Sequence, residues 1–114
     1  MSQIQALLFS IAIEAVVAFA LIRALRWGGG TRAALSATIG TLITHPVAWP
    51  AMLHLMAPLG YWAAVALVES GVVLAESVAY RLIVPLPWRR ALIASLVANG
   101  ASTGAGLFYY AWLD

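Results

Sequence analysis

Three glutamates, Glu14, Glu69 and Glu76, stand inside long apolar stretches of this sequence of 114 residues. An ionised carboxylate at the centre of a bilayer costs about 2.5–3.5 kcal/mol even on the lenient insertion scale. Three such groups facing lipid would therefore cost roughly 8–10 kcal/mol. We expect these side chains to face inward, to pair or to stay protonated, and at least one of them to be protonated near neutral pH.

His45 and Asn99 add two polar groups at a similar depth, provided that each apolar stretch is a helix. At ~1.5 Å per residue from the end of each helix that carries arginine, Glu14 lies about 16 Å in, His45 about 18 Å and Asn99 about 15 Å. On the same scale, Glu76 lies about 12 Å in and Glu69 about 22 Å. We predict that the five side chains form a proton- or cation-binding site near the middle of the bilayer.

Four further polar side chains fall on the same helix faces, at the short spacings that bring helix side chains together. They are Thr41, Tyr80, Ser102 and Thr103. We predict that they support the site with hydrogen bonds. The alternative is that all of these groups only join helices, at about 0.6 kcal/mol per contact.

Carboxylates with one imidazole suit a divalent metal such as Mn, Fe or Zn as well as a proton. Glu14, His45, Glu69 and Glu76 could hold such an ion, and a divalent metal is the one cofactor that the sequence suggests. The chain has no cysteine, which excludes disulfides and thiolate chemistry. The sequence motifs of hydrolases, zinc proteases, P-loop proteins and dinucleotide-binding enzymes are missing, so binding is favoured over catalysis.

The elements that must position these residues are helices in a lipid bilayer. Hydrophobic residues make up 64% of the chain and charged residues only 9%, whereas a soluble domain has about a quarter charged. The mean hydropathy is +0.96. The arginines flank apolar segments and form no basic stripe, which argues against nucleic-acid binding.

Each of four segments is long enough to span a membrane, which needs about 20 residues: about residues 4–25, 33–57, 61–84 and 88–113. Glycine or proline clusters at 28–30, 58–60 and 85–87 separate them, and Pro46 and Pro50 are expected to kink the second. The fold class is therefore an all-α integral membrane protein, a single domain over residues 1–114. We expect a four-transmembrane-helix bundle made of two helical hairpins.

All six basic residues are arginines and flank the first and third turns: Arg23, Arg26, Arg32, Arg81, Arg89 and Arg90. Basic residues near helix ends stay cytoplasmic. This distribution predicts a multi-pass protein of a bacterial-type inner membrane with both termini outside.

The segment Ile13-Glu14-Ala15-Val16, an acidic residue in an apolar helix, resembles the first helix of the small multidrug resistance transporters, which share the chain's size and helix number. The resemblance covers one helix and a single motif residue. The chain departs from that family in carrying Glu69 and Glu76 in the third helix and in lacking the family's glycine-rich third helix. The resemblance assigns no family.

Three functions remain open. The favoured hypothesis is a proton or cation site used for transport or coupling, by analogy with other intramembrane ionisable groups. The second is an accessory or assembly subunit of a larger membrane complex, and the third is a membrane enzyme acting on a lipid or quinone. Partners are the lipid bilayer and either a second copy or a larger complex.

Overall fold

The computed structural model describes residues 1–112, and this part of the chain folds into four helices with no sheet. The helices are α1 (Gln3–Leu25), α2 (Gly30–Leu59), α3 (Tyr61–Ile83) and α4 (Trp88–Trp112). They match the four predicted segments in number and order. Residue 113, the predicted end of the last segment, lies outside the described residues.

The helix α2 is longer than the sequence predicts at both of its ends. It begins at Gly30 and runs through Pro46, Pro50 and Pro58 to Leu59. Only Gly60 is left to turn the chain, with a φ of 81° that favours glycine. The N-terminus of α1 is held by a capping box, in which the Ser2 hydroxyl accepts from the Gln5 backbone amide.

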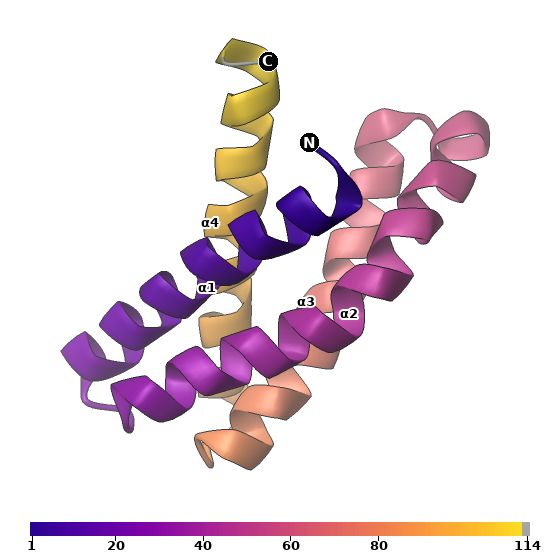
Figure 1. The fold of residues 1–114 in the computed structure, drawn as a ribbon. Helices are drawn as coiled ribbons and strands as arrows, with labels where there is room; N and C mark the ends of the chain where they lie inside the picture. The colour runs from indigo at the N-terminus through magenta and orange to yellow at the C-terminus, as the bar shows by residue number, and fades with distance from the viewer. Residues whose placement is uncertain (113–114) are drawn as a thin grey trace.

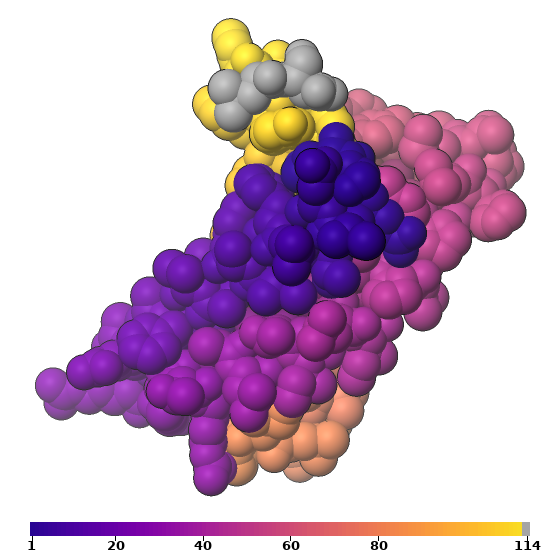
Figure 2. Space-filling model, viewed as in Figure 1, coloured from indigo at the N-terminus to yellow at the C-terminus, as the bar shows by residue number. Residues whose placement is uncertain are grey.

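The helices form a closed ring in which α1 packs on α2, α2 on α3, α3 on α4 and α4 on α1. Figure 1 shows the start of α1, the end of α4 and the α2–α3 turn toward one side of the molecule, which we call the terminal end. The α1–α2 and α3–α4 turns lie toward the other side, the arginine end. Figure 2 shows the first residues of the chain between the upper part of α4 and the α2–α3 turn.

The half of the bundle nearest the arginine end is tightly packed around small side chains. Its core joins five alanines to four larger residues, all of them buried: Ala18, Ile22, Ala33, Ala37, Tyr80, Val84, Leu86, Ala91 and Ala94. The turns also approach closely, since a Cβ on Gly28 would lie 2.8 Å from Val84 Cγ1. Across this end, the Arg90 guanidinium lies 5.1 Å from the Trp27 ring centre, which links the two hairpins.

The outside of the bundle is apolar, and the inside holds the buried polar groups. Large hydrophobic side chains such as Val16, Ile43, Leu74, Leu82 and Leu96 are exposed. Within the described part of the chain, α1, α3 and α4 are long and apolar enough to cross a membrane. This arrangement suggests a membrane protein, because a soluble monomer rarely exposes apolar patches of such extent.

Candidate functional site

Two of the predicted glutamates meet in the centre of the bundle. Glu14 of α1 and Glu76 of α3 are 2% and 1% exposed, and their carboxyl groups are in side-chain contact. The Thr41 hydroxyl of α2 lies between them, 3.3 Å from Glu14 Oε1 and 3.4 Å from Glu76 Oε1. We call Glu14 and Glu76 the carboxyl pair.

The fourth helix completes the surroundings of the carboxyl pair. Ser102 donates its hydroxyl hydrogen to Glu14 Oε2 at 3.0 Å, and Asn99 lies in side-chain contact with Glu76. The Asn99 amide is itself oriented by Ser95, because its Nδ2 donates to the Ser95 carbonyl at 2.9 Å. Five of the predicted residues therefore come together here: Glu14, Thr41, Glu76, Asn99 and Ser102.

The carboxyl pair has few hydrogen-bond donors around it. Thr41 lies within reach of both carboxyls, yet its hydroxyl carries one hydrogen and can donate to only one of them at a time. The Ser102 hydroxyl likewise lies near both Glu14 Oε2 and the Asn99 carbonyl, at 3.0 and 3.2 Å. Neutral hydroxyls thus surround two acidic groups that could together carry two negative charges. A proton or another cation at the pair would supply the missing charge and hydrogen.

Two contributors to the carboxyl pair were not predicted from the sequence. Thr44 donates to Glu76 Oε2 at 2.9 Å, the shortest contact of the pair with a hydroxyl. Gly40 leaves room for the Glu76 side chain, since a Cβ there would lie 3.0 Å from Glu76 Cγ. The spacing of Thr44 from Thr41 was a usable signal, because residues three apart share a helix face. Nothing in the sequence marked Gly40 among the other glycines.

The carboxyl pair lies at the bottom of a cavity of about 640 Å³ to which all four helices contribute. The cavity extends from Glu14 and Glu76 to the terminal end, where the exposed side chains of Met56, Tyr61 and Tyr110 line it. Its volume lies within the range of about 300–1,000 Å³ that is typical of small-molecule sites. Its walls are mainly apolar, and its lining includes none of the arginines.

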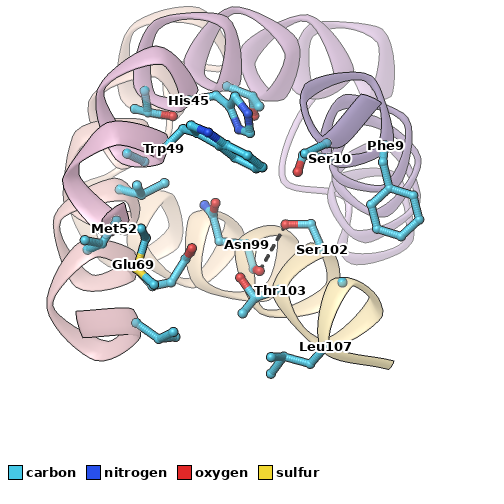
Figure 3. A pocket seen from close by; sticks show the side chains of 18 of the residues that line it. Phe9, Ser10, His45, Trp49, Met52, Glu69, Asn99, Ser102, Thr103 and Leu107 are labelled. Atoms are coloured by element: carbon cyan, nitrogen blue, oxygen red, sulfur yellow. Dashed lines mark hydrogen bonds between the residues drawn. The ribbon is translucent and has the colours of Figure 1, made fainter. Parts of the chain in front are cut away.

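His45 lines the cavity but does not join the carboxyl pair. Its ring centre lies 5.7 Å from that of Trp49, and the two rings lie next to each other beside the cavity (Figure 3). The Nε2 atom of His45 is buried and has no hydrogen-bond partner among the described residues. Trp49, a residue not predicted from the sequence, and the backbone of Gln3 are therefore neighbours of the imidazole.

Glu69 forms a second acidic point on the cavity wall, separate from the carboxyl pair. It lies two helical turns from Glu76 toward the terminal end and contacts the Thr103 side chain. Figure 3 shows Glu69 and Thr103 on neighbouring helices, with Asn99 and Ser102 close by. The predicted site is thus divided into two acidic levels.

Tyr80 is placed below the carboxyl pair, in the packed core and outside the cavity lining. Its side chain is 0% exposed, and its hydroxyl has no hydrogen-bond partner among the described residues. Tyr80 follows Glu76 by one helical turn on the same face of α3. Tyr80 therefore borders the pair from the arginine end.

The four residues considered as metal ligands are spread over the cavity. Glu14 and Glu76 are paired, whereas Glu69 and His45 have other neighbours. Within residues 1–112, no three histidine, aspartate or glutamate side chains gather closely enough to hold a metal ion. The arrangement therefore suits a proton or an organic cation better than a chelated metal.

Comparison of the chain with protein families, with curated proteins and with solved structures found no match to any of them.

Proposed function

We propose that this chain is a multi-pass protein of a bacterial-type inner membrane whose carboxyl pair binds a proton or a cation for transport or coupling. The observation that carries the proposal is the contact between two buried carboxyl groups, Glu14 and Glu76, at the bottom of a cavity. Two charged carboxylates in such a place would be costly to maintain. A proton or a cation held between them removes that cost.

The position of the carboxyl pair supports a role in transport or coupling. It lies where the cavity ends and the packed core begins, so the core separates an ion bound there from the arginine end. Ionisable groups inside membrane helices commonly mark ion pathways and proton relays. A purely adhesive contact between helices could be made by neutral side chains such as Asn or Thr.

The orientation in the membrane follows from the six arginines at the arginine end, which we place in the cytoplasm. Reporter fusions at Gly29 and Pro87 should therefore report a cytoplasmic location, and a fusion at Asp114 should report the outside. A cytoplasmic location for Asp114 would refute this orientation.

The function is tested by replacing each carboxyl with an amide, which keeps the size and removes the charge and the proton. In purified protein, infrared spectra should show a protonated carboxyl band near neutral pH that Glu14→Gln and Glu76→Gln both remove or shift. Proton uptake after an acid pulse should fall in both variants while their melting temperatures change little. Ser70→Ala, an exposed position on α3, is the matched control and should change neither signal.

Absence of a protonated carboxyl band below pH 7 would contradict the proposal. Stable variants with unchanged proton uptake would also contradict it, and would favour the accessory-subunit hypothesis, in which the polar groups only hold the bundle together.

A further inference from the structure

The cavity has two acidic levels on α3, and the side chain between them on that helix is apolar. Glu69 and Glu76 both line it from α3, and seven residues of helix separate them by about 10 Å along the axis. Val72 lies between them on the same face and also lines the cavity. Trp49 of α2, the helix that packs beside α3, extends its ring into the same cavity (Figure 3).

We infer that the cavity binds an aliphatic diamine, with one ammonium group at the carboxyl pair and the other at Glu69. This inference rests on the proposed function and names the cation that the site accepts. The cavity lining includes three carboxyl groups, one ammonium group at Met1 near the terminal end and none of the arginines, so its charge favours cations over anions. A hydrocarbon chain between the two amines would lie against Val72 and Trp49 and be removed from water.

The carboxyl pair suits a primary ammonium group because it has acceptors in excess of donors. An ammonium group carries three hydrogens and one positive charge. Two of these hydrogens can be accepted by the Oε1 atoms of Glu14 and Glu76, between which the single Thr41 hydroxyl hydrogen is shared. The third can be accepted by a further lone pair of the same two carboxylates, each of which has two oxygens.

Glu69 is suited to the second ammonium group because a neighbouring side chain contacts its carboxyl group without supplying a positive charge. Its contact is the neutral hydroxyl side chain of Thr103. It lies nearer the terminal end, where the cavity lining is exposed at Met56, Tyr61 and Tyr110. A diamine entering from that end would pass Glu69 before it reaches the carboxyl pair.

The test is calorimetric titration of the purified protein with three probes of equal chain length: diaminooctane, octylamine and octyltrimethylammonium. Diaminooctane should bind at least about tenfold more tightly than octylamine, because it adds a charged contact at Glu69. Octyltrimethylammonium should bind more weakly than octylamine, because it has no N–H hydrogens to donate.

Variants assign each ammonium group to its carboxyl level. Glu69→Gln should bring diaminooctane to the affinity of octylamine while leaving octylamine unchanged. Glu76→Gln should weaken both amines, and its melting temperature confirms that the bundle is intact. The control Ser70→Ala, on the exposed face next to Glu69, should bind all probes as the unmodified protein does.

Equal affinities for diaminooctane and octylamine, or a preference for diaminooctane that survives Glu69→Gln, would overturn the inference. The same follows if no amine binds. In each case the infrared carboxyl band tests the proposed function separately. A protonated carboxyl band that depends on Glu76 would support the proton site even if no diamine binds. If that band is absent, both the proton site and the diamine site are contradicted.

Discussion

The two halves of the bundle are built from the same four helices and differ in the size of the side chains that face inward. Toward the arginine end, alanines such as Ala37 and Ala94 let the helices approach until no space is left. Toward the terminal end, α2 instead carries His45 and Trp49, and a cavity of about 640 Å³ remains. The comparison teaches that small inward side chains close one half of the bundle while the other half keeps a cavity, with the carboxyl pair at the boundary.

Chemical labelling is the most sensitive test of the difference between the two halves. The chain has no cysteine of its own, so a single introduced cysteine is the only labelled site. A cysteine introduced at Leu107, on the cavity wall, should react almost completely with a small water-soluble thiol reagent. A cysteine at Ala94, which is 0% exposed, should react hardly at all in the folded protein. Labelling is followed by mass spectrometry. Rapid modification at position 94 would show that the arginine half is not closed.

A second test compares the tolerance of the two halves to added volume. Ala94→Leu should destabilise the protein by about 1–3 kcal/mol or more, because the packed core has no room for three further carbon atoms. Ala48→Leu, in the cavity lining, should change stability by no more than about 0.5 kcal/mol. Thermal unfolding in detergent measures both. Equal losses would mean that the cavity cannot absorb a larger side chain.

A third test addresses the boundary between the halves, with two glycines as a matched pair. Gly40→Ala should cost about 1 kcal/mol, because the new methyl group would lie 3.0 Å from Glu76 Cγ and must displace the carboxyl. It should also shift the infrared band of the carboxyl pair. Gly104→Ala meets nothing within 4 Å and should be neutral or stabilise the helix by about 0.5–1 kcal/mol. A Gly40→Ala protein with an unshifted band would contradict the close packing of Gly40 on Glu76.

The sequence predicted the helices well because long apolar segments and glycine or proline turns are local signals. It also placed Glu14, Glu76 and Asn99 at similar depths, about 12–16 Å from the arginine end, which needs only the rise per residue. It could not predict that Glu14 pairs with Glu76 and not with Glu69. That choice depends on how the helices rotate and cross, which is a property of packing over the whole bundle.

The remaining differences have the same origin. The position of Tyr80 on the face of Glu76 was correctly derived from spacing, but its place in the packed core depends on the alanines of neighbouring helices. His45 was grouped with the glutamates by depth, whereas its neighbour in the structure is Trp49. The depth of a residue along the helix axis can be predicted from its own helix. Its lateral neighbours can be predicted only when the arrangement of all four helices is known.

The packed half has an electrical consequence if the protein lies in the membrane as proposed. A membrane potential falls mainly across material of low dielectric constant, and here such material separates the carboxyl pair from the arginine end by about 12–16 Å. The pair would then sit close to the potential of the outer solution. Moving one elementary charge from it to the cytoplasm would involve most of the voltage, worth about 2.3 kcal/mol per 100 mV. The alanine core, which includes Tyr80, would thus be the low-dielectric layer across which most of the membrane potential falls.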